Sequence, residues 1–266
     1  MSALRPVTVI TGASAGIGVA LAREFARHGH ELALVARRRD RLETLADEIA
    51  ATGQPRPLVI VADLMQAGAA GTIGDALRVA GAEPQYVVNN AGFGLVGIAA
   101  TLDRAEQLSM IDLNMRALTE LSLAFVDAMA RQHGGLLNVG SIAGFLPGPG
   151  SAVYYASKAY VLSFSEALHS ELWARGVKVT VLCPGPVPTE FAARAGVTGE
   201  LAPGRLTQTA ERVAAAGYRG LMRGKRMVVP GIANKILLLA VRVLPRRIVL
   251  RLVGARQSKR RAAQAA

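Results

Sequence analysis

The sequence is poor in cysteine and has neither a long apolar run nor a signal peptide. Cys183 is the only cysteine in 266 residues, which excludes an intrachain disulfide and favours an intracellular setting. No apolar stretch reaches the roughly 18 uninterrupted residues that a membrane span needs. The first residues lead into an expected strand without the hydrophobic core of a signal peptide. These absences favour a cytoplasmic protein, with membrane association left open by its C-terminal segment.

Acidic residues are nearly absent from the last quarter of the chain. Residues 205–266 contain fifteen Lys and Arg but a single acid, Glu211, which is a balance of +14. Residues 1–204 contain sixteen basic and eighteen acidic groups, so the net charge of +12 comes from the C-terminal segment. The basicity therefore says little about the chemistry of the remaining body.

Strand-like and helix-like segments alternate along the chain, and its 51% hydrophobic residues are enough for a large core. Expected strands cover residues 7–10, 31–36, 58–62, 86–88, 136–139, the vicinity of Val181, and 227–229. Expected helices cover residues 17–28, 39–51, 67–80, 102–131 and 208–223. The alternation predicts a single α/β domain over residues 1–266, in which about 232–266 form a basic, apolar C-terminal helical extension.

Three glycines separate the first expected strand from the first expected helix. Gly12, Gly16 and Gly18 follow the spacing Gly-x-x-x-Gly-x-Gly. Glycines at this position let the backbone approach a pyrophosphate, which then lies at the helix N-terminus and its dipole. The loop predicts dinucleotide binding; the alternative is a tight turn between a strand and a helix.

Arginines follow the second expected strand, where an NAD-binding unit carries an acid against the ribose hydroxyls. In this chain Ala36 is followed by Arg37 and Arg38. A guanidinium suits a 2′-phosphate through paired N–H donors and charge, and the Ser14 hydroxyl could add a donor. The pattern favours NADP(H) over NAD(H); the alternative is a solvated, basic start to the helix expected at residues 39–51.

Polar residues also end the third and fourth expected strands. Asp63 could accept a hydrogen bond from an adenine amino group, or it could cap the next helix. Asn89 and Asn90 have amides that can bridge neighbouring strand ends, and the small residues Ala91 and Gly92 leave room for a flat ligand. A purely structural role for the asparagines is the alternative.

A Ser, a Tyr and a Lys follow in the second half of the chain. Tyr154 and Lys158 are one helical turn apart and share a helix face, while Ser141 follows a strand end. An ammonium beside a phenol lowers the tyrosine pKa, which favours proton exchange with a carbonyl or hydroxyl group. Asn114 falls inside a helical pattern, where a buried amide would distort the turn or hold a water.

Together these motifs resemble those of the short-chain dehydrogenase/reductase family. The matching pieces, in the family's order over residues 7 to about 190, are Thr11-Gly-Ala-Ser-Ala-Gly-Ile-Gly18, Asp63, Asn89-Asn-Ala-Gly92, Asn114, Ser141, Tyr154-Tyr-Ala-Ser-Lys158, Pro184-Gly185 and Thr189. The resemblance implies a Rossmann-like, doubly wound parallel sheet of about seven strands with helices on both faces. It also implies a Ser-Tyr-Lys centre assisted by an Asn, with the off-register Tyr155 and Tyr160 as packing residues.

The resemblance extends to the cofactor contacts. The expected contacts are Gly12, Ser14, Gly16, Ile17, Gly18, Arg37, Arg38, Asp63, Leu64, Asn90, Ala91, Gly92, Tyr154, Lys158, Pro184, Gly185, Val187 and Thr189. The last four would hold the nicotinamide carboxamide, and residues 188–204 resemble the family's mobile substrate loop. No metal site is implied.

We therefore expect an NADP(H)-dependent oxidoreductase that interconverts a ketone or aldehyde and an alcohol by hydride transfer, on a hydrophobic or lipid-like substrate. Ser141 would orient the carbonyl oxygen and Tyr154 would donate the proton. Lys158 would lower the tyrosine pKa and bind the nicotinamide ribose, and Asn114 would hold a water of a proton relay. The alternative is a catalytically silent NADP(H)-binding sensor or scaffold, which would need the glycine loop but not the proton donor. The expected assembly is a homodimer or homotetramer.

The C-terminal segment permits more than one role. From about Ile232, apolar runs alternate with arginines on both sides of Pro245. These runs are too short to span a bilayer, but they could lie along a membrane surface. Packing over the substrate pocket or against another subunit are the alternatives. Nucleic-acid binding is disfavoured, because the interleaved Leu and Val suit a lipid or protein surface better.

Overall fold

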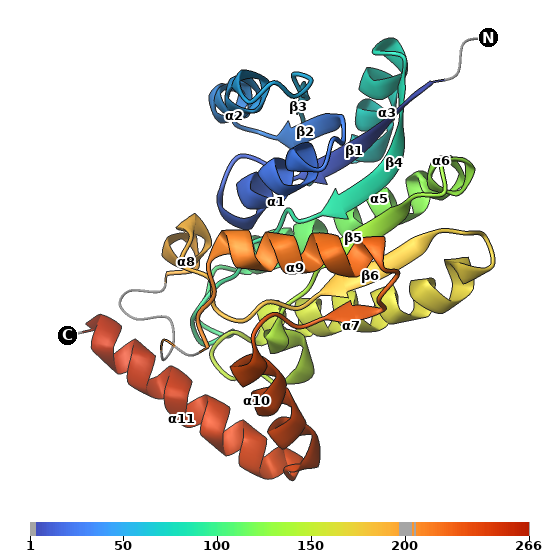
Figure 1. The fold of residues 1–266 in the computed structure, drawn as a ribbon. Helices are drawn as coiled ribbons and strands as arrows, with labels where there is room; N and C mark the ends of the chain where they lie inside the picture. The colour runs from blue at the N-terminus through green and yellow to red at the C-terminus, as the bar shows by residue number, and fades with distance from the viewer. Residues whose placement is uncertain (1–3, 197–203, 205, 266) are drawn as a thin grey trace.

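The computed structural model of the protein describes residues 4–196, 204 and 206–265, with side chains as far as Ala255 (Figure 1). Seven parallel strands form one sheet in the order β3-β2-β1-β4-β5-β6-β7. The strands are β1 (Arg5–Thr11), β2 (Leu32–Ala36), β3 (Leu58–Val61), β4 (Ala82–Asn89), β5 (Gly135–Val139), β6 (Lys178–Leu182) and β7 (Met227–Val228). The predicted Rossmann-like sheet is confirmed, with strand ends that differ from the expected ones by a few residues.

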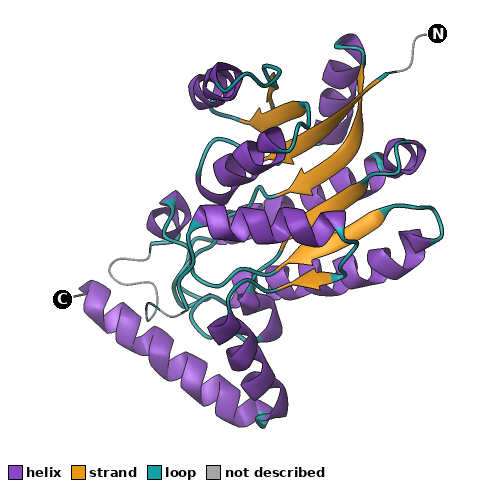
Figure 2. Cartoon of the chain, viewed as in Figure 1, coloured by secondary structure: helices purple, strands orange, loops and turns teal. Residues whose placement is uncertain are grey.

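Helices cover both faces of this sheet (Figure 2). One face carries α1 (Gly16–Arg27), α2 (Arg39–Ala51) and α9 (Ala210–Met222), and the other carries α3 (Ala69–Val79), α5 (Leu118–Ala124), α6 (Val126–Arg131) and α7 (Ala152–Trp173). Strand β1 shows why the strands read as unbroken apolar runs: Val9 packs into one core and Ile10 into the other. Successive side chains point to opposite faces, so a strand between two helical layers needs apolar residues throughout.

The helical pattern of residues 102–131 is not one helix. It divides into α4 (Arg104–Ile111), a π-helical segment η1 (Asp112–Ala117), α5 and α6. Asn114 lies inside the π-helical segment and is 1% exposed. The predicted distortion at a buried asparagine is therefore present, and the continuous helix is corrected to a broken one.

The strand order places a switch point between β1 and β4. From β1 the chain builds outward to β2 and β3 on one side, whereas β4 to β7 extend on the other. At such a point the connections leave in opposite directions and open a crevice at the carboxyl ends of the strands. Ligands of open parallel sheets bind in this crevice, so the strand order predicts the position of the site.

The C-terminal segment is helical and stands outside the two helical layers. After β7, helix α10 (Ile232–Val243) and helix α11 (Arg246–Ala265) meet at Pro245 and form a hairpin on the side of the strand carboxyl ends (Figure 1). Proline suits this corner because it cannot continue the preceding helix. Two short elements lie in the same region, the 3₁₀ turn η2 (Ile142–Phe145) and helix α8 (Glu190–Arg194).

Candidate active site

A cavity of about 700 Å³ opens at the carboxyl ends of the strands. Of the predicted site residues, those that line it are Gly12, Ser14, Gly16, Ile17, Arg37, Arg38, Asp63, Leu64, Asn90, Ala91, Gly92, Ser141, Tyr154, Lys158, Pro184, Gly185, Val187 and Thr189. Gly18 and Asn114 lie behind the lining. The structure therefore gathers into one space residues that are spread over most of the sequence.

The glycine loop has the backbone shape that only glycine adopts easily. Gly12 and Gly16 have φ angles of +66° and +56°, in the left-handed region. Gly18 serves a different purpose, because a Cβ there would lie 2.2 Å from the carbonyl oxygen of Gly12. Gly18 thus lets the first turn of α1 approach the loop, which leaves that helix N-terminus directed at the cavity.

Arg38 ties the glycine loop to helix α8. Its guanidinium donates to the Ser14 hydroxyl at 3.1 Å and to the Ser14 carbonyl at 3.2 Å. The same group donates to a carboxylate oxygen of Glu190 at 3.0 Å, and Arg41 contacts the other oxygen. These contacts lower the pKa of Glu190, the hydrogen bond from Arg41 contributing most. Ser14 and Arg38, predicted separately, are therefore hydrogen-bonded neighbours.

The polar strand ends have local structural partners. Asp63 accepts a hydrogen bond from the backbone N–H of Met65 at 3.1 Å, within the turn that follows β3. The next helix, α3, has Gly68 as its N-cap, so Asp63 does not have the capping role considered for it. Asn90 donates to the carbonyl of Thr11 at 2.9 Å, and Asn89 donates to the side chain of Asn138 at 2.9 Å. The asparagine amides thus bridge β4 to both neighbouring strands, as their position predicts, and this bonding holds the cavity floor.

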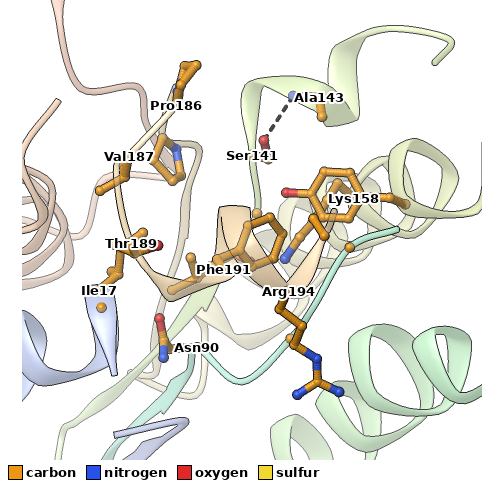
Figure 3. A pocket seen from close by; sticks show the side chains of 18 of the residues that line it. Ile17, Asn90, Ser141, Ala143, Lys158, Pro186, Val187, Thr189, Phe191 and Arg194 are labelled. Atoms are coloured by element: carbon orange, nitrogen blue, oxygen red, sulfur yellow. Dashed lines mark hydrogen bonds between the residues drawn. The ribbon is translucent and has the colours of Figure 1, made fainter. Parts of the chain in front are cut away.

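Ser141, Tyr154 and Lys158 meet at one end of the cavity. Ser141 follows β5, and its hydroxyl accepts from the backbone N–H of Ala143 at 3.1 Å (Figure 3). Tyr154 and Lys158 project from the first turns of α7, with the ammonium 5.9 Å from the centre of the tyrosine ring. Lys158 is 6% exposed and donates to the carbonyl of Val139 at 2.8 Å.

The pKa of Tyr154 is raised, whereas the sequence predicted that it would be lowered. Burial raises the pKa of Tyr154 to about 12, and the hydrogen bond with Ser141 opposes this only in part. Burial lowers the pKa of Lys158 to about 8, against the influence of Cys183 nearby. The ammonium is directed at the Val139 carbonyl rather than the phenol, so desolvation outweighs the predicted lowering of the tyrosine pKa by Lys158.

Asn114 supports the site from behind. Its side chain accepts from the backbone N–H of Phe93 at 3.1 Å and donates to the Phe93 carbonyl at 2.9 Å. It also donates to the Ser157 hydroxyl at 3.1 Å, next to Lys158 in the sequence. A Cβ on Gly92 would lie 2.8 Å from the Asn114 side-chain oxygen. The π-helical segment thus holds Gly92 and Phe93, which follow the end of β4, against α7.

The loop after β6 closes the opposite wall. Pro184 accepts from the backbone N–H of Ile142 at 3.0 Å, which joins this loop to the turn after Ser141. Thr189 packs on the glycine loop, since a Cβ on Gly16 would lie 3.0 Å from its side chain. Figure 3 shows Val187 and Thr189 on the side of Ile17, and Ser141 and Lys158 across the cavity. Residues 197–203 of the expected substrate loop lie outside the described residues.

Several lining residues were not predicted from the sequence. The Phe191 ring lies 5.6 Å from the Tyr154 ring, and the Arg194 guanidinium lies 4.4 Å from the Phe93 ring. Tyr155, expected to be a packing residue, packs against Gly148 but also lines the cavity. Tyr160 is a packing residue, stacked on Phe164 at 5.6 Å and hydrogen-bonded to Thr119.

The C-terminal hairpin supplies part of the cavity wall. The lining residues from this hairpin are Leu237, Ala240, Val241, Leu244, Val249, Leu252 and Val253. Leu237 and Val241 are four residues apart and share a helix face, a signal that could have identified the cavity-facing side of α10. Packing over the pocket, one of the alternatives for this segment, is what the structure shows for that face.

The sequence and the fold are similar to those of known short-chain dehydrogenases. A profile of the family described as short chain dehydrogenase matches residues 6–198. Sulfoacetaldehyde reductase 2 of Chromohalobacter salexigens is 38% identical over 188 residues, which cover 70% of this chain and 74% of that protein. A short-chain dehydrogenase from Sphingobium yanoikuyae, solved with NADPH, is 31% identical with a TM-score of 0.78, over 89% of this chain and 93% of the other. A short-chain dehydrogenase/reductase from Burkholderia phymatum, solved with NAD, is 25% identical with a TM-score of 0.78, over 91% of this chain and 94% of the other.

Proposed function

The chain belongs to the short-chain dehydrogenase family, and from that premise we propose that it is an NADP(H)-dependent oxidoreductase that interconverts a hydrophobic ketone or aldehyde and the corresponding alcohol. The observation that carries the proposal is the convergence of Ser141, Tyr154 and Lys158 on one end of a cavity with a largely apolar wall. A sensor or scaffold would not need a proton donor at that place, so we do not favour that alternative.

Tyr154 is assigned the proton transfer. A phenol with a pKa of about 12 keeps its proton at neutral pH, so it can donate to a carbonyl oxygen as that oxygen gains negative charge. The Ser141 hydroxyl, already bonded to this phenol, would orient the same oxygen. The Lys158 ammonium would stabilise the tyrosinate that remains, because a positive charge in a dry site acts strongly on a nearby anion.

The residues around the glycine loop fit a dinucleotide. Gly12, Gly16 and Gly18 leave a backbone free of Cβ atoms next to the N-terminus of α1, where a pyrophosphate would be held. Bound NADP(H) would supply or accept the hydride of the reaction. Asn90, Val187 and Thr189 would position its nicotinamide side, and Asp63 and Leu64 its adenine side.

Ser14 and Arg38 support the choice of NADP(H). They are hydrogen-bonded to each other at the cavity edge, next to Arg37, and present a hydroxyl and guanidinium donors to one place. A 2′-phosphate needs this combination of charge and paired donors, whereas a free ribose hydroxyl does not. The solved relatives hold either nicotinamide cofactor, so this preference rests on the side chains.

The cavity wall supports a hydrophobic substrate. Beyond the Tyr154 end, the wall is formed by apolar side chains of three regions, among them Leu95, Val96, Leu146, Phe191, Leu237, Val241 and Val249. A ligand gains binding free energy from such a wall in proportion to the apolar area that it buries. A bulky apolar ketone would therefore be preferred over a small polar one.

Asn114 is proposed as a positioning residue. Its amide holds the Phe93 backbone and Ser157, which fixes the segments on both sides of Lys158. The water of a proton relay that the sequence suggested for Asn114 stays a prediction. The single-domain organisation of residues 1–266 also stays a prediction. So do the homodimer or homotetramer, which light scattering would measure, and the cytoplasmic location, which cell fractionation would measure.

The test is turnover with a graded set of carbonyl compounds. Oxidation of NADPH and NADH is followed with ketones and aldehydes that range from small and polar to steroid-sized and apolar. We expect NADPH and bulky apolar ketones to give the highest kcat/KM. Tyr154→Phe should lower kcat by about 10²-fold or more, in line with a lost general acid, while NADPH binding by fluorescence persists.

Tyr160→Phe is the matched control, because it removes a hydroxyl from the same helix outside the cavity lining. It should leave kcat within about twofold. Near-normal turnover of Tyr154→Phe on a good substrate would show that the proton donor is assigned wrongly.

A further inference from the structure

The outer face of helix α10 is apolar and uncovered. Ile232, Ile236, Leu239 and Val243 recur at intervals of four, three and four residues, so they lie on one side of the helix. Their exposed fractions are 63–76%. We call these four residues the outer stripe. At the rise of an α-helix the stripe is about 16 Å long.

A different face of α10 holds the helix against the body. Leu237, Ala240 and Val241 line the cavity from a face about a third of the helix circumference away from the outer stripe. At the first turn, fully buried Asn234 donates to the carbonyls of Pro230 at 3.0 Å and Leu206 at 3.3 Å. The helix is therefore anchored, and the outer stripe is presented outward by a fixed element.

The charged side chains of the hairpin, from Ile232 to Ala255, are all positive. On the side away from the cavity, α10 carries the exposed residues Lys235 and Arg242, seven positions apart. Arg246, Arg247 and Arg251 continue as exposed residues in the first turns of α11. Residues 212–266 contain no acid at all. An apolar strip bordered by cations alone has the chemistry of a surface that meets an anionic, partly apolar partner.

We propose that the outer stripe and its basic border dock on an anionic lipid surface, with α10 lying in the plane of the interface. Ile, Leu and Val side chains would enter the boundary of the acyl region, and Lys235 and Arg242 would reach the headgroups. An in-plane orientation agrees with the described part of the chain, where no helix combines the length and hydropathy needed to cross a bilayer.

The charge pattern argues against the other occupants. A second copy joined through the same patch by a twofold axis would bring two basic borders together without a carboxylate from residues 212–266 to neutralise them. A nucleic acid would satisfy the arginines but would leave four apolar side chains against a charged backbone. An anionic bilayer offers both the negative surface and the apolar layer.

Docking would also bring the cavity rim towards lipid. Leu244 and Leu252 line the cavity while they are 37% and 60% exposed, and both lie on the same hairpin as the outer stripe. A membrane-dissolved ligand could then reach the cavity along apolar side chains. The docking itself does not depend on any reaction, and it is measured without cofactor or substrate.

The experiment is vesicle flotation with the full-length protein. Vesicles of phosphatidylcholine with phosphatidylglycerol are compared with pure phosphatidylcholine, at low and high salt. We expect binding only to the anionic vesicles, weakened by salt because exposed charges are screened. Ile236→Ser with Leu239→Ser should reduce binding by about tenfold or more, because apolar area no longer enters the interface.

The basic border is tested separately. Each Lys or Arg near an anionic surface strengthens binding by about fivefold, so Lys235→Gln with Arg242→Gln should lower it by about 30-fold. Arg78→Gln with Arg104→Gln removes the same charge from exposed positions of other helices and should have little effect. Val79→Ser is the control for the apolar change, since Val79 is 87% exposed on α3.

Light scattering of the same proteins distinguishes the remaining outcomes. If the wild-type protein ignores anionic vesicles and the outer-stripe variant reduces its assembly mass, a second copy covers this face and the proposal is overturned. Retention of a DNA duplex without vesicle binding would overturn it as well. Equal flotation of the outer-stripe variant, the Val79→Ser control and the wild type would show that another surface meets the lipid.

Discussion

Glu190, the first residue of α8, accepts a hydrogen bond from Arg38 at 3.0 Å, although 152 positions separate the two residues. Arg41 contacts the other oxygen of the same carboxylate. Glu190 thus joins the segment after β6 to the arginines proposed for the 2′-phosphate. A carboxylate and a phosphate are both anions that a guanidinium binds through paired donors, so the two compete for Arg38.

The first prediction concerns this competition. Glu190→Gln removes the negative charge, and we expect the NADPH dissociation constant to fall by about two- to fivefold, since an exposed ion pair is a weak competitor. NADH has no 2′-phosphate, so its affinity should not change. Fluorescence titration with both cofactors measures the effect. Glu43→Gln, which removes a carboxylate bonded to Arg39 and Arg56, is the control. Weaker NADPH binding would mean that Glu190 instead holds Arg38 in place.

The second prediction concerns the arginines. Replacing both Arg37 and Arg38 by Ala should weaken NADPH binding by about tenfold or more, because charge-assisted hydrogen bonds to the phosphate are lost. NADH binding should change far less. Arg39→Ala is the matched control, because Arg39 is exposed and pairs with Glu43 outside the cavity lining. An equal loss for both cofactors would assign the two arginines to folding or to general charge.

The third prediction concerns Lys158 and pH. Burial lowers its pKa from 10.5 to about 8, so between these values the unfolded chain binds a proton that the folded chain has released. The free energy of unfolding therefore gains a contribution as pH rises through this window, whereas below about pH 8 the cost of the buried charge is present in full. We expect the stability of the wild type relative to Lys158→Met to increase from about pH 7.5 to about pH 9.5.

Urea unfolding of the two proteins at each pH measures this difference. Tyr154 and Cys183 have raised pKa values of about 12, so they act in the opposite direction at high pH. They are present in both proteins and largely cancel in the comparison. A difference that stays constant with pH would place the lysine pKa near its ordinary value.

The fourth prediction concerns Gly18. A Cβ at this position would lie 2.2 Å from a backbone oxygen, so Gly18→Ala should force the glycine loop away from α1. We expect cofactor affinity to fall by about tenfold or more and the protein to lose about 1–3 kcal/mol of stability, as for an overpacked core. Calorimetry and thermal unfolding measure both.

Gly71→Ala is its control, because Gly71 lies inside helix α3 and its added Cβ meets no atom within 4 Å apart from its chain neighbours and that helix's own backbone. Alanine should be neutral or stabilising there by up to about 1 kcal/mol. If Gly18→Ala behaved like Gly71→Ala, the close approach of α1 to the loop would not be needed for binding.

The sequence by itself determined the sheet, the glycine loop and the order of the motifs. These features depend on local chemistry: apolar runs mark buried strands, Gly12 and Gly16 mark a backbone that other residues rarely adopt, and Gly18 marks a close approach. Asn114 likewise predicted a distorted helical turn, because a buried amide competes for backbone hydrogen bonds. Because parallel strands end at one edge of a sheet, the placement of most of the predicted residues around one cavity could follow from their positions after strands.

Only the tertiary structure decided what depends on distant neighbours. The pKa values of Tyr154 and Lys158 are set by burial, which no four-residue spacing reveals, and this reversed the expected direction for the tyrosine. The Arg38–Glu190 pair joins segments whose approach is dictated by the whole sheet. For α10, the sequence showed apolar runs that alternate with arginines. Packing against the body then divided them into a cavity wall at Leu237 and an exposed stripe at Ile236.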